Sequence, residues 1–200
     1  KGAFLDADKA FEVINGMRTV EVRVLLKAIN TLVLARALAA HPAINVRCSA
    51  VEGNENYALR ERLMYLGLPA PLFTIDLDTE MGRRISRHAF QRFFDCLEPA
   101  FGLQVTLGQA NTVVVCPALT SHSELSDAAL REAGISLTTI RIAVGDEDPR
   151  GLLAHLMQAA ELALEPECPG FTRYFGQPHE IDALYESIYV DVHRRYAASR

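Results

Sequence analysis

The chain has 200 residues, 50% of them hydrophobic and 22% charged, with a formal net charge of -5 and an isoelectric point near 5.7. This length and composition are sufficient to bury a substantial core in one large or two small globular domains. The acidic balance argues against a nucleic-acid-binding surface, which needs clustered Lys and Arg, and no apolar run approaches the ~20 residues that span a bilayer.

The first predicted element is one long helix over residues 8–41, in which apolar residues recur at helical spacing, with Gly16 as a candidate break. At about 1.5 Å per residue, some 30 residues would reach about 45 Å. A helix of this length is typical of a connection between two bodies. His41-Pro42 ends it, and a short strand is predicted over residues 44–48.

The middle of the chain alternates helices and strands. We expect a helix over residues 56–65, a strand over 72–77 and an amphipathic helix over 83–96. Two strands are expected around 103–107 and 112–116, separated by Gly108-Gln109. Ser126 can cap a short helix that ends at Gly134, and Asp148-Pro149 is a strong start for a helix that runs to about residue 164. With a further strand over 138–145, this order predicts an α/β layer arrangement of about five short strands with helices on one face.

The last segment has a different character. Residues 165–170 resemble a linker, and a final helix follows. We therefore divide the chain into a long helix (1–41), a domain (42–164) and a linker with an extra helix (165–200). The apolar face of the final helix either docks on the domain's own surface or contacts a partner, and it comprises Ile181, Leu184, Tyr185, Ile188, Tyr189, Val192 and Tyr196.

A single arginine lies in the predicted strand 138–145. Alternation places Ile140, Ile142 and Val144 on one face and Arg141 on the other, among small residues. This is the geometry of a cleft floor where a carboxylate or phosphate could meet the guanidinium fork. The alternative is an arginine that is simply solvated.

The segment around this arginine resembles the cysteine/methionine metabolism (trans-sulfuration) family of pyridoxal-phosphate-dependent enzymes, which includes cystathionine synthases and lyases and O-acylhomoserine sulfhydrylases. Family-like steps follow one another in order over about 45 residues: Leu107-Gly108, Cys116-Pro117-Ala118, Ser121-His122, Leu125-Ser126, Gly134-Ile135 and Arg141 to Asp148. The front of the chain is similar to the family's interdomain stretch, with a match at Gly16 to Arg23, at Asn30 and at His41-Pro42.

The resemblance implies a fold and a site. The fold would be the small C-terminal domain of the aspartate-aminotransferase-like (fold type I) architecture, with a mainly antiparallel sheet. Arg141 would bind the α-carboxylate of an amino-acid substrate, such as a sulfur amino acid or an activated homoserine ester. Asn111 and Thr112 stand where the family commonly has Glu-Ser, in a loop near the substrate. Cys116 replaces the family's usual histidine and Asn15 its usual arginine, which marks a divergent member.

The family's cofactor, pyridoxal phosphate, needs a lysine amine for its Schiff base. The three lysines, Lys1, Lys9 and Lys27, all lack the family's Ser-x-Thr-Lys context, and Lys9 and Lys27 are expected to be solvated positions on the long helix. No catalytic or cofactor-binding residue is therefore predicted in this chain, and we expect it to be inactive alone. We expect a large N-terminal domain before residue 1 to bind the cofactor. We expect the complete protein to be a homo-oligomer, either a dimer or a tetramer.

Two other functions remain open. The chain could be a catalytically incomplete domain that serves dimerisation or ligand binding, or a hydrolase or metal enzyme built on Cys116 and His122. The second has little support, because the histidines are scattered and the cysteines Cys48, Cys96, Cys116 and Cys168 have no spacing typical of zinc ligands or of a disulfide framework. No metal site is predicted, and free thiols are typical of the reducing cytoplasm.

Overall fold

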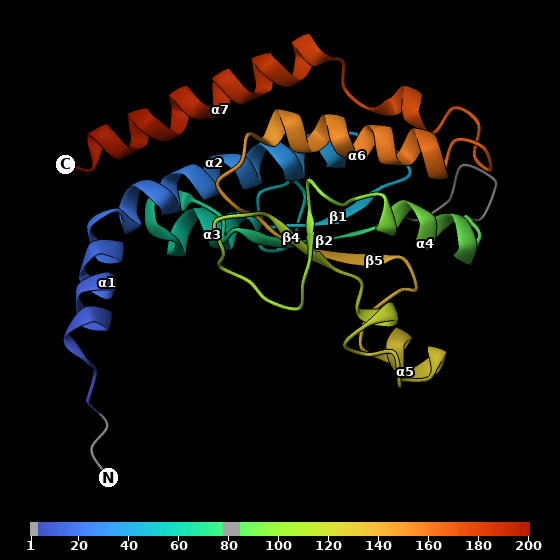
Figure 1. Cartoon of the computed structure of the whole chain (residues 1–200). Coiled ribbons are helices and arrows are strands. Elements are labelled where there is room, and N and C mark those ends of the chain that lie inside the picture. Colours follow the sequence, from blue (N-terminus) through green and yellow to red (C-terminus); the bar gives the residue numbers. More distant parts are fainter. Residues whose placement is uncertain (1–3, 78–84) are drawn as a thin grey trace.

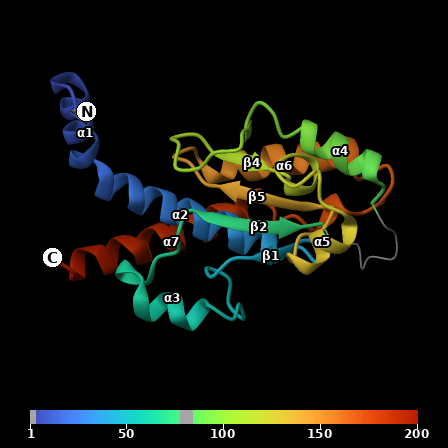
Figure 2. The ribbon, with the colours of Figure 1, turned by 90° about the horizontal axis from the view of Figure 1, so that it is seen from below.

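The computed structural model describes residues 4–77 and 85–200. They form a five-stranded sheet with a layer of helices on one face, while the short helix α5 lies on the other side (Figure 1). Figure 2, seen from below, shows the strands with α2 and α6 behind them. The predicted α/β class, with helices mainly on one face, is confirmed.

The sheet is mixed and mainly antiparallel. Its order is β1-β2-β5-β4-β3, and only β3 and β4 run parallel. The strands are β1 (Asn45–Arg47), β2 (Leu72–Asp76), β3 (Gly102–Leu103), β4 (Val113–Val115) and β5 (Thr139–Ala143). The prediction of a strand over 103–107 is wrong beyond Leu103, because the short edge strand pairs with only two residues of β4 and Val105 and Leu107 gain no buried face.

The helices follow the predicted pattern with small shifts in their ends. Ser126 and Asp148 cap their helices as expected, each accepting a hydrogen bond from a backbone N–H of the first turn. The expected start at Arg83 lies outside the described residues, and Ser86 caps the helix that follows. The helices are α1 (Ala7–Arg18), α2 (Val20–Ala39), α3 (Tyr57–Leu63), α4 (Arg87–Asp95), α5 (Asp127–Glu132), α6 (Pro149–Ala163) and α7 (Pro178–Ala198), with short 3-10 helices η1 (Tyr65–Gly67), η2 (Pro117–Leu119) and η3 (Thr172–Tyr174).

The long N-terminal helix is two helices, and the chain turns sharply between them (Figure 1). The break is at Thr19, with φ -111° and ψ 2°, and not at Gly16. Arg23 stabilises the turn, since its guanidinium donates to the Gly16 carbonyl at 2.8 Å and to the Thr19 hydroxyl at 3.3 Å. No residue of α1 is buried, so no packing in this structure opposes the break.

Helix α2 lies between the sheet and α7. Its residues from Leu25 to Ala35 are almost all buried, on every side of the helix. A helix surrounded in this way needs no polar face, which explains its apolar sequence. Three polar residues, Lys27, Asn30 and Thr31, are nevertheless among its buried residues, and the first two bear on the site described below.

The C-terminal segment packs on the domain. Ile188 and Val192 of α7 are buried, and most of the predicted apolar face contacts the core. Tyr189 is the exception, since it is 42% exposed. Before α7, the segment predicted as a linker is ordered by the Glu165 carboxylate, which accepts from the backbone of Gly170 and Thr172. This apolar face therefore docks on the chain's own helices.

His41, at the end of α2, is the anchor for this segment. Its ring lies between Phe171 and Phe175, with centroids 4.4 and 4.8 Å away. Nδ1 accepts from the backbone N–H of Ala43 at 3.1 Å, and Nε2 donates to the Phe171 carbonyl at 2.9 Å. Both ring nitrogens are used by the neutral tautomer. Burial lowers the pKa of His41 from its usual 6.5, and the backbone hydrogen bonds oppose this only in part.

We expect the stability of the chain to fall as the pH decreases below about 6.5. The unfolded chain takes up a proton at this histidine first, so the free energy of unfolding is lost between its usual pKa and its lowered pKa in the fold. Urea denaturation at pH 7.5, 6.5 and 5.5 measures the slope of the free energy of unfolding against pH. Replacement of His41 with glutamine should flatten the slope, and an unchanged slope would assign the pH dependence to other groups.

Candidate functional site

Arg141 lies in the middle of β5, the central strand of the sheet. It pairs with Thr74 of β2 and with Val115 of β4. Its neighbours Ile140 and Ile142 are buried in the core shared with the helical layer. Since side chains alternate along a strand, Arg141 projects from the opposite face, as the sequence predicts.

This face of β5 is more buried than expected for a strand with one face in solvent. Thr139 and Ala143, which share it with Arg141, are also buried, and only Arg141 in β5 is partly exposed. The Thr139 hydroxyl donates to the Asp76 carboxylate, which also binds the Arg47 guanidinium. These polar groups satisfy one another beside the strand, which leaves Arg141 as the polar group of β5 that a ligand could reach.

The guanidinium of Arg141 is only partly satisfied. Nη2 donates to the Thr106 carbonyl at 3.0 Å. Nε is buried and has no hydrogen-bond partner among the described residues. A buried donor without a partner costs about 1–3 kcal/mol. A carboxylate that reached this edge of the guanidinium would remove that cost and add charge-assisted hydrogen bonds.

Residues 104–112 form a loop, here called the site loop, that contacts Arg141 through Thr106. Asn111 is exposed in this loop, so its amide is accessible to a ligand, as a substrate-binding role requires. Leu107 and Val105 are also exposed, at 58% and 65%. The loop that contacts Arg141 therefore exposes one polar and two apolar side chains.

Thr112, the other loop residue selected from the sequence, is fully buried. Its hydroxyl donates to Glu147 Oε2 at 2.8 Å and accepts from the backbone N–H of Gly145 at 2.9 Å, and its own backbone N–H donates to Glu147 Oε1 at 2.6 Å. The Thr112 side chain is therefore buried and its hydroxyl is engaged within the fold. Thr112 fixes the end of the loop to the turn that follows β5.

Helix α2 supports the same turn. Asn30 is fully buried, and its side-chain amide donates to the carbonyls of Gly145 and Glu147 at 3.1 and 2.8 Å. Asn30 is one of the positions that resemble the family, and this contact gives it a physical role. It joins α2 to the segment that holds Thr112.

Lys27 is a residue that the sequence reasoning missed. It was expected to be solvated, but it is 7% exposed. Its ammonium donates to the Gln109 carbonyl in the site loop and lies 3.8 Å from Asp146 Oδ1. Its spacing of three residues from Asn30 places both on one face of the helix. This spacing is the feature of the sequence that could have indicated a buried lysine.

Cys116 and His122 do not form a reactive pair. Cys116 is fully buried, and burial raises the pKa of its thiol, which disfavours the nucleophilic thiolate. His122 is exposed, and its Nδ1 is 2.8 Å from the Ser121 hydroxyl. This geometry gives no support to a hydrolase.

In the part of the chain that the structure describes, no three His, Cys, Asp or Glu residues come together as metal ligands would. Over the same residues, no helix combines the length and the apolar character needed to cross a bilayer.

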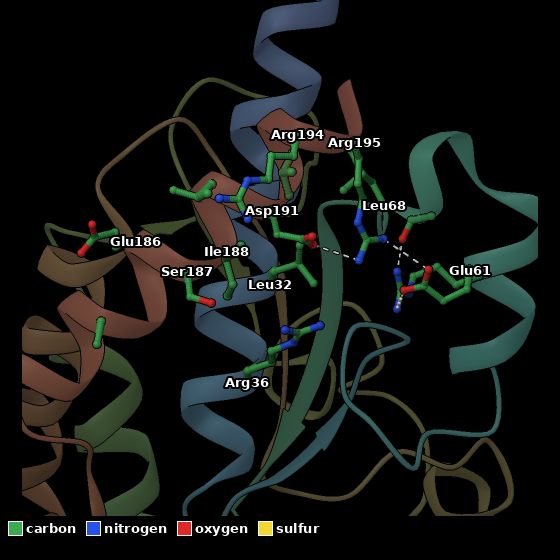
Figure 3. A pocket seen from close by; sticks show the side chains of 15 residues that line it. Leu32, Arg36, Glu61, Leu68, Glu186, Ser187, Ile188, Asp191, Arg194 and Arg195 are labelled. Atoms are coloured by element: carbon green, nitrogen blue, oxygen red, sulfur yellow. Dashed lines mark hydrogen bonds and ion pairs between the residues drawn. The ribbon is translucent and has the colours of Figure 1, made fainter. Parts of the chain in front are cut away.

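A separate pocket of about 630 Å³ lies between α2, α3, η1 and α7 (Figure 3). Its charged side chains largely pair with one another: Arg195 contacts Asp191 at 2.9 Å and Glu61 at 3.3 Å, and Glu61 also contacts Arg60. Arg60 is buried and donates to the carbonyls of Ser49 and Gly67. We interpret these ion pairs as the attachment of α7 to the domain.

Comparison with known proteins gives consistent matches. The family model of the Cys/Met metabolism PLP-dependent enzymes matches residues 1–161. A homocysteine synthase of Schizosaccharomyces pombe is 29% identical over 154 residues, which cover 76% of this chain and 34% of that protein. An L-methionine gamma-lyase of Pseudomonas deceptionensis is 32% identical over 159 residues, which cover 79% of this chain and 38% of that protein. The chain thus spans little more than a third of the length of these relatives.

Solved structures match over the same part. An O-acetylhomoserine (thiol)-lyase from Campylobacter jejuni, whose structure contains N'-pyridoxyl-lysine-5'-monophosphate, has a TM-score of 0.67 at 28% identity, over 80% of this chain and 36% of that one. A cystathionine gamma synthase from Xanthomonas oryzae pv. oryzae, in complex with cystathionine, has a TM-score of 0.63 at 26% identity. The match covers 78% of this chain and 38% of that one. The family match ends at residue 161, so α7 lies outside it.

Proposed function

Since the chain belongs to the family of Cys/Met metabolism PLP-dependent enzymes, we propose that it supplies the substrate-carboxylate site of such an enzyme. The enzyme would be a lyase or transferase that acts on sulfur amino acids or activated homoserine esters. One observation carries the proposal: among the residues that the structure describes, the buried Nε of Arg141 has no hydrogen-bond partner, although Arg141 lies in the central strand of the sheet. The named activities of the relatives, a homocysteine synthase and a methionine gamma-lyase, agree with this substrate class.

The residues of this chain would bind and orient the substrate. A guanidinium fixed in a central strand holds a carboxylate by two parallel hydrogen bonds, which restricts the direction of the bonds at the substrate's α-carbon. The exposed amide of Asn111 is available to the rest of the substrate. Thr112 contributes indirectly, because it fixes the end of the site loop through Glu147.

The cofactor of the family supplies the electron sink for reactions at an amino-acid carbon. It needs a lysine amine for attachment, and the two described lysines do not fit that role. Lys9 is exposed on α1 near Asp6, and Lys27 is engaged by Gln109 and Asp146. We therefore propose that a large domain outside this sequence, N-terminal to it, holds the cofactor in the cytoplasmic, homo-oligomeric enzyme.

The N-terminal helix supports this arrangement. Helix α1 buries no residue, and its apolar side chains Phe11, Ile14 and Met17 are 62%, 51% and 67% exposed. Exposed apolar side chains gathered on one helix are typical of a surface that another body covers. We propose that α1 and α2 connect the domain described here to the cofactor-binding domain.

The full-length gene product tests the function. We expect it to bind pyridoxal phosphate, to change its visible absorption when a sulfur amino acid or an O-acylhomoserine is added, and to release a thiol or a keto acid or to form a new thioether. An assay panel of methionine, cystathionine and the two O-acylhomoserines would decide the reaction type. The absence of any spectral change or product with all of them would reject the proposal.

A separate measurement tests where the cofactor is held. We expect residues 1–200 alone, treated with pyridoxal phosphate at a 1:1 ratio and then with borohydride, to yield no stoichiometric adduct by mass spectrometry. The reason is that Lys9 has no enclosed surroundings and Lys27 is occupied. Stoichiometric labelling of either lysine would show that this chain can attach the cofactor by itself.

A further inference from the structure

Lys27 occupies a place where three segments of the chain converge. Its ammonium extends from α2 to the Gln109 carbonyl in the site loop and to Asp146 in the turn after β5. The turn and the loop also contact each other directly, since the Asp146 backbone N–H donates to the Ala110 carbonyl at 2.6 Å. One buried cation thus bridges the helix, the loop and the turn.

Its charge is compensated locally. The Lys27 side chain is 9% exposed, and Asp146 Oδ1, 3.8 Å from the ammonium, is itself buried with no hydrogen bond from residues 4–77 and 85–200. A buried ammonium is costly unless a carboxylate or a carbonyl faces it. Each of these two groups therefore needs the other, and the ammonium held beside Asp146 also binds the Gln109 carbonyl.

Besides the backbone hydrogen bond from Asp146 to Ala110, three side chains anchor the site loop. Arg141 holds the Thr106 carbonyl, Lys27 holds the Gln109 carbonyl, and Glu147 holds Thr112 at the end of the loop. A carboxylate bound to Arg141 competes with the Thr106 carbonyl for the same guanidinium. When the substrate is bound, the anchors inside the loop that do not depend on Arg141 are then the Asp146 backbone N–H and Lys27, and of these two only Lys27 comes from α2.

We propose that Lys27 is a positioning residue that holds the site loop, and with it Asn111, at a fixed distance from Arg141. This inference rests on the proposed substrate site. It goes further because it names α2 as the element that determines the position of the site loop. A shift of α2 would move Lys27 and the loop together, and would thereby change the distance between the loop and Arg141.

The test compares Lys27→Met with Lys27→Arg in the full-length protein. Methionine keeps the length and the apolar stem but lacks the charge, whereas arginine keeps the charge. We expect Lys27→Met to raise the KM for the amino-acid substrate by about 10-fold, with kcat changed less than about 3-fold, and Lys27→Arg to recover part of the loss. Arg131→Met, which removes an exposed cation from α5, is the control and should leave both constants unchanged.

Hydrogen exchange gives a readout that does not require activity. In Lys27→Met we expect faster exchange in peptides from residues 104–112, with peptides from β5 and α6 unchanged. An unchanged KM and unchanged loop exchange would overturn the proposal, and so would faster exchange throughout the domain, because Lys27 would then be a structural residue. If the unmodified protein shows no activity on amino acids, the proposed function fails, while the exchange measurement still decides whether Lys27 holds the loop.

Discussion

Replacing Arg141 with methionine in the full-length protein is expected to lower kcat/KM for the amino-acid substrate by about 100-fold or more. A hydrogen bond to a charged group contributes about 1.5–3 kcal/mol, and a guanidinium offers a carboxylate two of them. Every 1.4 kcal/mol is about a tenfold change in affinity. Because methionine fills a similar volume, the loss would come mainly from the missing charge and donors.

Two further variants test whether the loss comes from the guanidinium group of Arg141. Arg141→Lys keeps the charge but not the planar fork, so it should restore only part of the activity. Arg131→Met removes an exposed arginine from α5 and should have no effect. The measurement is steady-state kinetics with the substrate varied. A KM for Arg141→Met equal to that of the unmodified protein would exclude Arg141 from substrate binding.

Replacing Gly145 with alanine is expected to destabilise the domain by about 1–3 kcal/mol, the usual range for overpacking. An added Cβ would lie well inside van der Waals contact of the Ala110 carbonyl oxygen, the Asn111 carbonyl carbon and Glu147 Oε2. Two of these atoms belong to the backbone of the site loop, so the loop has to move. We expect activity to fall together with stability, because the loop that carries Asn111 and contacts Arg141 through Thr106 is displaced.

Gly151→Ala is the matched control for this change. Gly151 lies in the first turn of α6, and an added Cβ there meets no atom of the described part of the chain within 4 Å. Alanine is a better helix former than glycine by up to about 1 kcal/mol, so this variant should be neutral or more stable. Urea denaturation of the two variants is the measurement. Equal stability of Gly145→Ala and the unmodified chain would mean that the site loop can shift without cost.

The fold was predictable from the sequence where local rules agree with packing. The start of α6 follows from Asp148-Pro149, and the alternation of Ile140 and Ile142 about Arg141 locates β5 and its two faces. Both features depend on neighbours in the sequence. They hold because the tertiary structure places the same residues in the core.

The site was predictable only in part. The position of Arg141 follows from the strand, and Asn111 is exposed as a binding role requires. The burial of Thr112 and Lys27 depends on Glu147 and Asp146 across long separations in the chain. Periodicity cannot reveal such pairs, because an isolated helix pattern places a lysine in water by default.

The same reason explains the wrong helix break. Gly16 has the lower helix propensity, yet the chain turns at Thr19, where Arg23 satisfies the carbonyl that the turn releases. Propensity ranks single residues, whereas the break depends on a side chain four residues further on. A prediction from the sequence would need to consider this donor.

The path of α7 has a practical consequence for labelling experiments. The helix runs back along α2 (Figure 1). Arg200 forms an ion pair with Glu21 in the first turn of α2. The C-terminus therefore lies close to the bend at Thr19. A fluorophore attached after residue 200, paired with a second one on α1, would report changes of the angle between α1 and α2, while a bulky affinity tag at the same end would disturb that angle.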